Sequence, residues 1–503
     1  MKYFISVRRI TILIWLMFFG YQQVFAQGRN AVFFMGYHDA PTSNEARMVF
    51  TDTSYSLMLE QRSIPFLDTQ GNISDENGNL LMSSNGIFIA DATGDTMMNG
   101  GGLNPNSFTD NFKQNGLPIG YANLFLPMPA DSNKYILFHQ TLSYTTWDSP
   151  NIFYSIVDVS LNNGLGQVIS KNNIALSGSF GGGLTACRHG NGRDWWIVAV
   201  SNDGSLLHEF LLTPDTLIYT GVQNLSLQPN FGYAGQATFS PDGEKFVFRN
   251  GYVSGMYWNL YLNLINFDRC SGIFTLDTVI NYSDSTIGYG TIFSPNSKYL
   301  YFSTSEHIYQ IDTESPNIGA TFQTVATNDT FLSAPPVFYT NFYLMYLAAN
   351  GKIYISSSSS VLDLHEMDYP DSAGVDCNVN LHNIHTNCFF IGVPNHPNYY
   401  LGRLVGSACD TLTSVNEIVQ HDFRFSISPN PNNGNFRIMY LLPQNKNGTL
   451  QIFDITGKEV YSQNLPPWST LQFISVPKLS DGVYQCTITS NNQRVNKKLV
   501  VVE

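Results

Sequence analysis

The sequence predicts an all-β protein, built as a β-propeller followed by a small β-sandwich. Three observations support this fold class. Aromatic residues make up 14% of the 503 residues and charged residues only 13%, and a chain rich in Tyr, Phe, Thr and Val favours strands over helices. A short turn that precedes a strand recurs at a nearly constant interval. After Leu404, short alternating runs follow one another at closer spacing, which indicates a second domain.

The recurring turn contains Asn or Asp, often followed by Gly, and leads into a strand of aromatic and β-branched residues. Two copies share the longer matches Phe239–Phe248 and Phe293–Phe302. Asn-Gly and Asp-Gly suit hairpin turns because the central residues adopt positive φ. Each repeat holds three or four short alternating runs, which is the content of one propeller blade. The turns begin, at intervals of 51 to 60 residues, at Asn77, Asp131, Asn191, Asp242, Asn296 and Asn350.

The residues that flank the six turns determine the number of blades. About Asn30–Leu67 precede the first turn, and Cys388–Leu404 follow the last complete repeat. We expect these flanks to pair in one mixed blade, which gives a seven-bladed propeller over residues 27–405; six blades is the alternative. Such radial repetition leaves only short, protected strand edges.

The N-terminus carries the pattern of an export signal. Three basic residues among the first nine precede the apolar run Ile10–Phe19, and small residues lead up to Ala26. This pattern predicts a signal peptide over residues 1–26 that is cleaved before Gln27. The apolar run is shorter than the ~20 residues that span a bilayer, so we expect an exported protein with no transmembrane segment in the mature chain.

The composition changes again after the propeller. Residues 406–422 are polar and lack periodicity, which is typical of a linker, and residues 423–503 hold six or seven short strands, which predict an Ig-like β-sandwich. This last segment contains ISPNPNNGNFRI, LQIFDITGKEV, LSDGVYQCTIT and a terminal KKLVVVE. It resembles the type A C-terminal sorting domain of the type IX secretion system. The matching motif residues are Pro429, Asn430, Pro431, Gly434, Asp454, Gly457, Lys458, Gly482, Tyr484 and Lys498.

The resemblance implies an export address that the outer-membrane translocon reads and that is usually removed. It also implies a secreted or cell-surface location, with the cargo released or attached to surface lipopolysaccharide. The body of the chain is similar to the β-propeller-like (WD-like repeat) region of large secreted proteins that carry this signal, through stretches such as ISDENGNLLMSSNG and LTACRHGNGRDWWIVAV. That second resemblance implies a link to gliding motility or adhesion for some members and implies no chemistry.

Two constellations in the propeller are candidate sites. Cys377 and Cys388 are the closest of the six cysteines, and an exported chain permits disulfides, so we expect them to pair. With His382 and His385 they also have the residue types of a zinc site, but their spacing differs from standard zinc ligand pairs, and we expect no metal and no cofactor.

The second constellation is the segment HGNGRDWW. Trp faces bind apolar and CH-rich ligands, so this segment is a candidate binding loop. The alternative is that Asn191-Gly192 is simply the blade turn and the Trp pair begins its strand. The candidate residues of this loop are His189, Arg193, Asp194, Trp195 and Trp196.

The remaining sequence evidence bears on function. The formal net charge of −13 disfavours nucleic acid and anionic lipid as partners, and we find no linear catalytic motif and assign no catalytic residue. Our leading hypothesis is a non-catalytic surface propeller for binding or adhesion, whose partners are the type IX machinery and a glycan, a surface polysaccharide or another exported protein. The alternative is a secreted hydrolase or lactonase, which predicts carboxylates or His at one mouth of the central channel.

Overall fold

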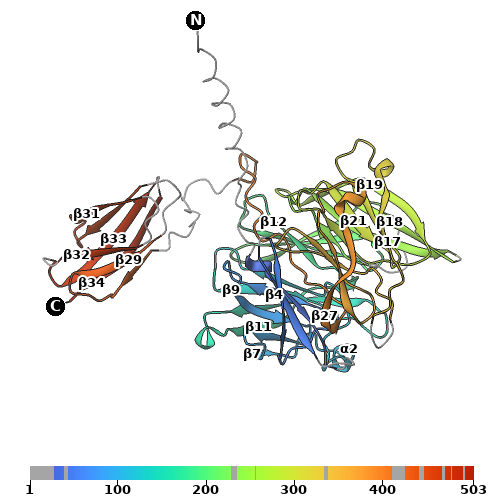
Figure 1. Cartoon of the computed structure of the whole chain (residues 1–503), viewed down its shortest axis with the longest axis horizontal. Coiled ribbons are helices and arrows are strands. Elements are labelled where there is room, and N and C mark those ends of the chain that lie inside the picture. The colour runs from blue at the N-terminus through green and yellow to red at the C-terminus, as the bar shows by residue number, and fades with distance from the viewer. Residues whose placement is uncertain are drawn as a thin grey trace, which may run out of the picture. The chain divides into compact units, whose positions relative to one another are not determined.

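The computed structural model describes residues 28–502 apart from 39–43, 52, 228–234, 255, 334–337, 411–424, 441–446, 467–470, 477–478 and 491–492. The predicted signal peptide and most of the predicted linker lie outside the described residues. The chain divides into two compact units, Met1–Thr411 and Leu412–Glu503, which are described separately (Figure 1). Within the described residues, no helix combines the length and apolar character needed to cross a membrane.

The described part of the first unit holds one three-stranded sheet and six groups of four antiparallel strands, in sequence order. The first three groups are β1 (Val32–Met35), β2 (Glu45–Phe50), β3 (Tyr55–Glu60); β4 (Gly71–Ser74), β5 (Leu80–Ser84), β6 (Phe88–Asp91), β7 (Thr96–Gly101); and β8 (Asn123–Pro127), β9 (Lys134–His139), β10 (Ser149–Asp158), β11 (Gln167–Phe180). A parallel bridge between Gln167 and Met98 joins β11 to β7.

The other four groups repeat the same antiparallel order. They are β12 (Thr185–Arg188), β13 (Trp195–Val200), β14 (Leu206–Leu212), β15 (Leu217–Asn224); β16 (Thr238–Phe239), β17 (Lys245–Ser254), β18 (Tyr257–Asp268), β19 (Ile273–Asp284); β20 (Thr291–Phe293), β21 (Tyr299–Ser303), β22 (His307–Asp312), β23 (Gln323–Thr327); and β24 (Met345–Leu347), β25 (Ile353–Ile355), β26 (Val361–Met367), β27 (Val379–Phe390). Short helices lie in the connections: η1 (Gly28–Asn30), α2 (Ser107–Asn111), η2 (Asn162–Gly164), η3 (Ile318–Thr321) and η4 (Gly374–Cys377).

Each repeated turn connects the first and second strands of one four-stranded blade. The turn at Asn191, for example, joins β12 to β13, and the N–H of Gly192 donates to the carbonyl of His189 at 2.8 Å. Gly192 has a φ of 75°, a conformation that glycine adopts without a steric penalty. The predicted β-propeller, and the role of the repeat as one blade, are therefore confirmed.

The core of the propeller lies between neighbouring blades. In β17, Phe246 and Phe248 pack with Trp196 of the preceding blade, whereas Val247 between them packs with Phe293 of the following blade. Successive strand residues point to opposite faces, and both faces of a blade are covered. The second strands therefore carry apolar side chains on both faces over much of their length, which contributes to the high aromatic content and the low charge.

The ring closes differently from our expectation of a mixed blade. β27 completes the last blade with its own fourth strand, and β1–β3 form a separate sheet. This sheet lies beside both neighbours, since the Asn72 side chain donates to the Val32 carbonyl at 3.1 Å and the Phe33 ring contacts Phe390 at 6.0 Å. Seven blades therefore form, but the predicted pairing of the two flanks is wrong.

Residues 391–404, called the channel segment from here on, form no strand. The N–H of Asn395 lies 3.3 Å from the Gln70 carbonyl, and its side-chain amide donates to the carbonyls of Asn123 at 3.0 Å and Leu184 at 2.8 Å. The Asn398 amide donates to the Pro241 carbonyl at 2.7 Å. Because these partners border the first strands of four different blades, the channel segment runs along the centre of the propeller.

A disulfide between Cys270 and Cys409 fastens the chain just beyond the channel segment. Cys270 lies in the turn between β18 and β19, and the two Cα atoms are 5.3 Å apart. Cys377 and Cys388 are buried free thiols, so the predicted disulfide is wrong. Cys377 ends η4 and Cys388 lies near the end of the extended strand β27. At about 3.3 Å per residue the strand places the two Cα atoms far beyond the ~7 Å that a disulfide can bridge.

We expect four reactive thiols when the protein that retains its sorting domain is denatured without reduction, because Cys187, Cys377, Cys388 and Cys486 are free; removal of the sorting domain, which contains Cys486, should leave three. A thiol titration measures this number, and peptide mapping of the unreduced protein should recover Cys270 linked to Cys409. Six reactive thiols, or a linked Cys377–Cys388 peptide, would contradict the structure.

The second unit is a sandwich of two antiparallel sheets, as the sequence predicts. One sheet has the order β28-β29-β32 and the other β31-β30-β33-β34. Apolar residues from both sheets, such as Ile438 and Leu450, share one core. The strands are β28 (Ser426–Ser428), β29 (Asn435–Met439), β30 (Gly448–Phe453), β31 (Glu459–Leu465), β32 (Leu471–Ser475), β33 (Gly482–Ser490) and β34 (Gln493–Val501).

Candidate functional site

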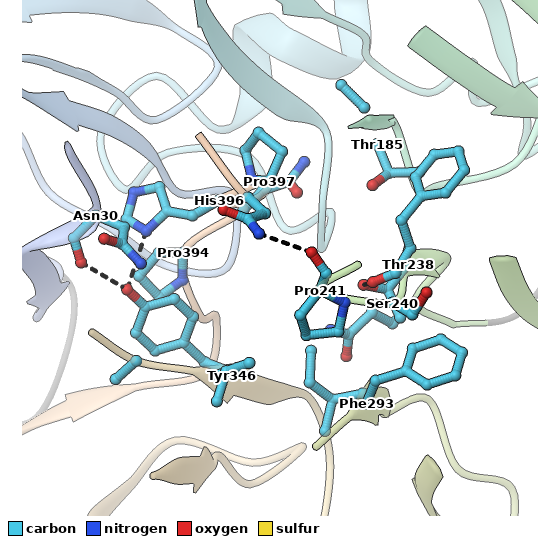
Figure 2. A pocket seen from close by; sticks show the side chains of 18 of the residues that line it. Asn30, Thr185, Thr238, Ser240, Pro241, Phe293, Tyr346, Pro394, His396 and Pro397 are labelled. Carbon is cyan, nitrogen blue, oxygen red and sulfur yellow. Dashed lines mark hydrogen bonds between the residues drawn. The ribbon is translucent and has the colours of Figure 1, made fainter. Parts of the chain in front are cut away.

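A cavity of about 320 Å³ lies beside the channel segment, at the end of the propeller that carries the repeated turns. Its wall comes from the first strands β12, β16, β20 and β24, from the turns at Pro241 and Asn350, and from residues 394–398. Figure 2 shows His396 and Tyr346 on one side of this pocket and Thr185, Thr238 and Phe293 on the other. We call it the channel pocket.

Apolar groups cover much of the channel pocket. Phe239 and Phe293 lie on neighbouring first strands, and Leu401 comes from the channel segment. Four prolines also line it, and their fixed φ angles make the surrounding turns stiff. Such a wall favours the apolar faces of a ligand. The prolines are Pro241, Pro295, Pro394 and Pro397.

The polar groups of the pocket are uncharged amides, hydroxyls and one imidazole. The Gln236 amide donates to the Met345 carbonyl at 2.8 Å, and its oxygen accepts from the Met345 N–H at 3.2 Å. His396 Nε2 lies 3.0 Å from the carbonyl oxygen of Asn72, and Nδ1 lies 3.0 Å from the Tyr346 hydroxyl. A carbonyl only accepts, so Nε2 carries the hydrogen of the neutral ring. The Tyr346 hydroxyl donates to the Asn30 carbonyl at 2.9 Å, so its one hydrogen lies between that carbonyl and Nδ1.

Burial keeps the ionisable groups of the pocket neutral. It lowers the pKa of His396 to about 4, against an opposing hydrogen bond to Asn72, and it raises the pKa of the Cys187 thiol to about 12. A neutral imidazole and a protonated thiol are poor partners for an ion. Among the described residues that line the pocket, none is Asp, Glu, Lys or Arg, so the pocket suits an uncharged ligand.

One carboxyl lies elsewhere along the channel. Asp68 precedes β4, and burial raises its pKa to about 7. Its Oδ2 lies 3.5 Å from the Tyr343 hydroxyl, and its Oδ1 has no hydrogen-bond partner among the described residues. Asp68 is not among the residues that line the channel pocket.

The structure places the predicted binding loop in a turn and its strand. His189 Nδ1 accepts from the Asn191 N–H at 3.0 Å, and Arg193 Nε lies 2.7 Å from Asp194 Oδ1. The end of the channel segment covers this turn, because the Leu404 N–H donates to the Gly190 carbonyl at 2.8 Å. The polar side chains of the loop therefore bond to one another and to the backbone of the turn.

Both tryptophans of this loop are buried, and their rings do not face solvent. Trp195 is 0% and Trp196 4% exposed. The Arg188 guanidinium lies 4.0 Å from the Trp195 ring, and Trp196 Nε1 donates to the Arg269 carbonyl at 2.8 Å. The segment is therefore a blade turn followed by its strand, which was the alternative interpretation. The structure does not place the Trp faces where a ligand could contact them.

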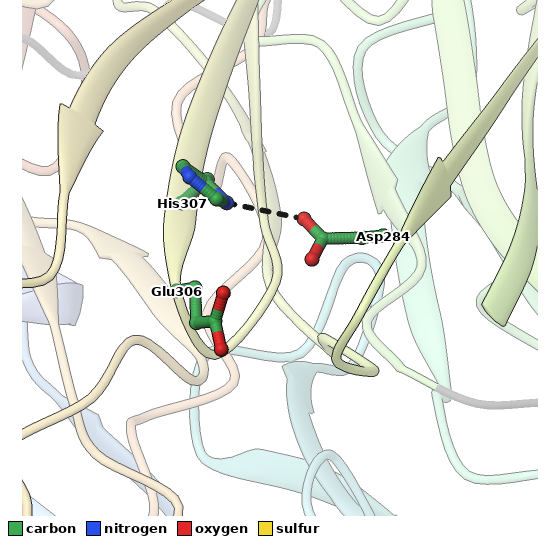
Figure 3. A group of neighbouring side chains, drawn as sticks. All are labelled: Asp284, Glu306 and His307. Carbon is green, nitrogen blue, oxygen red and sulfur yellow. Dashed lines mark hydrogen bonds and ion pairs between the residues drawn. The ribbon is translucent and has the colours of Figure 1, made fainter. Parts of the chain in front are cut away.

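A second cluster contains Asp284, Glu306 and His307 (Figure 3). Asp284 ends β19, Glu306 directly precedes β22, and His307 is the first residue of β22. Asp284 Oδ2 accepts from the hydroxyls of Thr304 and Tyr309, both at 2.8 Å. Burial would raise the pKa of Asp284, but these hydrogen bonds hold it below its usual value. The carboxylate is thus already satisfied by the fold, and we assign the cluster no ligand.

Several sorting-domain motif residues form turns in the second unit. The Asn430 side chain donates to the Lys498 carbonyl and accepts from the Val500 N–H, each at 2.8 Å. Asp454 accepts the N–H of Lys458 at 3.0 Å in the turn between β30 and β31, where Gly457 has a φ of 84°. These motif residues therefore fix the edges and turns of the sandwich.

The comparisons with known proteins identify this second unit. Residues 426–502 match the family described as "Secretion system C-terminal sorting domain". A type IX sorting domain indicates a protein that is exported to the cell surface or secreted, and it implies an interaction with the type IX machinery. No curated protein matches the chain.

Solved structures that resemble the chain are distant. The Sqt1 protein of Chaetomium thermophilum, solved bound to the N-terminus of ribosomal protein L10, is 13% identical over 68% of this chain and 83% of that chain, with a TM-score of 0.36. A putative TolB from Agrobacterium tumefaciens is 16% identical over 55% and 84%, with a TM-score of 0.28. A protein of unknown function from Bacteroides thetaiotaomicron is 11% identical over 93% and 90%, with a TM-score of 0.27. The propeller assignment rests on the order of the sheets.

The depressed pKa of His396 makes its contribution to stability depend on pH. Between pH 6.5 and about 4 the unfolded chain binds a proton at this residue that the folded chain does not, so the wild type loses stability as the pH falls. His396→Gln cannot titrate and lacks this loss. Urea unfolding at pH 7 and 4.5 should show the wild type declining relative to the variant, by at most about 1.4 kcal/mol per pH unit. A difference that is the same at both pH values would contradict the buried, neutral imidazole.

Proposed function

We propose that this protein is an exported propeller that binds an uncharged ligand, such as a glycan, at the cell surface without catalysing a reaction. The N-terminal 26 residues would direct it across the inner membrane, and the sorting domain would direct it across the outer membrane. The observation that supports the binding role most strongly is the channel pocket, which is preformed, partly apolar and free of charged side chains among its described lining residues.

The size and wall of the pocket define what it can hold. Ligand pockets usually measure about 300–1,000 Å³, so a cavity of about 320 Å³ takes a small group such as one sugar residue or one side chain of another exported protein. Phe239 and Phe293 provide flat apolar surface, and Thr185 and Asn398 provide uncharged hydrogen-bonding groups. This combination suits the CH face and the hydroxyl edge of a neutral sugar.

The same wall bears on the alternative of a hydrolase or lactonase. Hydrolysis at a channel mouth needs an acid and a base, or a metal, next to the substrate. The titratable groups lining the described part of the pocket are held neutral by burial, and Asp68 lies outside it. Binding therefore has support that hydrolysis lacks.

A substitution that fills the channel pocket tests the binding role. Ala349 lies in the turn after β24 and lines the pocket, so Ala349→Phe should occupy part of the cavity. We expect the mature protein to bind neutral oligosaccharides on a glycan array and Ala349→Phe to bind them about tenfold more weakly or not at all. Ala92→Phe, at an exposed turn between β6 and β7, is the matched control and should bind like the wild type.

Three results would contradict this proposal. They are the absence of binding to any neutral oligosaccharide, equal binding by Ala349→Phe and the wild type, and the release of shortened products from the array ligands. The last result would favour the hydrolase.

Export is tested by removing the second unit. Deleting residues 423–503 should leave the protein in the periplasm, because the family match covers residues 426–502. The retained propeller should stay folded, since the first unit has its own core, and circular dichroism and the thiol count verify this. Surface delivery of the truncated protein at the normal level would refute the sorting role of this unit in this chain.

A further inference from the structure

Two exposed aromatic rings meet at a right angle on the loop between β9 and β10. Trp147 is 65% and Tyr144 40% exposed, their ring centroids are 5.9 Å apart, and their planes are at 90°. We call this pair the aromatic corner. Unlike Trp195 and Trp196, whose rings fill the core, these rings offer their faces to solvent, and a Trp face binds apolar, CH-rich groups.

The aromatic corner rests on a fixed base. Phe108 of α2 is buried beneath it, with its ring centroid 4.9 Å from that of Tyr144 and 6.4 Å from that of Trp147. The Asn106 side chain ties the two loops together by donating to the Leu142 carbonyl at 2.8 Å. Because the rings are held in place before a ligand arrives, binding loses little conformational entropy.

The backbone at Trp147, whose ring is exposed, is strained. Trp147 has a φ of 56°, in the left-handed region that is unfavourable for a bulky residue. Its N–H donates to the Ser143 carbonyl at 2.8 Å, and the Asp148 carboxylate next to it accepts from the hydroxyls of Thr146 and Ser179. Strain that the surroundings maintain is typical of functional loops, so it supports a role for the exposed ring.

The groups around the aromatic corner are polar and mostly uncharged. The Asn111 side chain donates to the Tyr144 hydroxyl at 2.7 Å, which leaves the hydroxyl hydrogen of Tyr144 able to donate to a ligand. Thr145 and Thr146, which lie between Tyr144 and Trp147 in the sequence, are exposed. Three charged residues lie nearby: Asp110 and Lys113 pair with each other at 2.7 Å, and the buried Asp148 carboxylate accepts from Thr146 and Ser179.

We infer that the aromatic corner binds a neutral polysaccharide chain, with the CH face of one sugar ring on Trp147 and its hydroxyl edge toward Tyr144 and the threonines. A sugar fits better than an apolar peptide, because an apolar group would cover the Tyr144 hydroxyl, whose hydrogen is free to donate, without giving it an acceptor. A neutral chain fits better than an acidic one, because the protein has a net charge of −13.

This site is separate from the channel pocket. The pocket lies at the end of the strands that carries the repeated turns, such as the β8–β9 turn, whereas the β9–β10 loop lies at the opposite end of β9. The aromatic corner therefore adds a second contact to the proposed binding function, and either site can fail its test without the other.

The test uses the full mature protein and three uncharged hexasaccharides as probes, built from glucose, mannose and N-acetylglucosamine. Calorimetry and quenching of Trp fluorescence measure binding by the wild type, Trp147→Ala, Tyr144→Ala and Ala349→Phe. Tyr369→Ala, which removes a single ring that is 61% exposed outside the corner, is the control. We expect at least one probe to show a binding component that Trp147→Ala weakens about tenfold or more and Tyr144→Ala weakens less. Tyr369→Ala should leave this component unchanged, and it should persist in Ala349→Phe, whose loss is confined to any component bound in the channel pocket.

Each other outcome overturns the inference. Absence of binding to all three probes, or equal binding by Trp147→Ala, removes the glycan role of the corner. Loss of binding only in Ala349→Phe assigns the sugar to the channel pocket and supports the proposed function alone. Concentration-dependent self-association that Trp147→Ala abolishes, in the absence of sugar, would instead make the corner a contact between copies of this chain. Unchanged melting temperatures verify that the variants fold.

Discussion

The architecture of the propeller depends on the hydrogen bonds of one buried asparagine in its centre. Asn395 is almost fully buried, and its backbone and side-chain amides reach carbonyls beside the first strands of three blades, at Gln70, Asn123 and Leu184. A propeller has no core on its axis, because the packing lies between blades. The channel segment supplies polar partners for backbone groups that face this axis, and buried carbonyls left without partners are costly.

This constraint explains both how the ring closes and where a ligand can enter. The last blade is complete without the N-terminal strands, so the segment after β27 is free to enter the channel, and the Cys270–Cys409 disulfide fastens the chain just beyond it. The channel segment fills one side of the channel and leaves the other side as the channel pocket. The amides, prolines and neutral imidazole of this segment also set the chemistry of the pocket, so closure and ligand choice share the same residues.

The blades of the propeller could be predicted from the sequence, but the path of the chain through its centre could not. The turn at Asn191 and the strand after it depend on local φ preferences and on period-two alternation, which a single repeat already displays. The disulfide partner of Cys270 lies 139 residues away, and no local pattern encodes such a distance. One signal for the channel segment was present: Pro394 and Pro397 lack the N–H that a strand ladder needs, which argues against the mixed blade. The predicted binding loop at Trp195 was wrong because its pattern is local but ambiguous. A Trp pair next to a turn has the same sequence pattern whether its rings face a ligand or the core.

The free energy of unfolding of Asn395→Ala tests the central role of the channel segment most directly. The substitution removes two hydrogen bonds and orphans the carbonyls of Asn123 and Leu184, so we expect a loss of about 2–4 kcal/mol in urea unfolding of the mature protein. Asn398→Ala removes the bond to the Pro241 carbonyl and an exposed bond from the Tyr400 N–H, and it should lose about 1 kcal/mol. A loss below about 0.5 kcal/mol for Asn395→Ala, the range of ordinary surface substitutions, would show that the channel segment does not hold the propeller together.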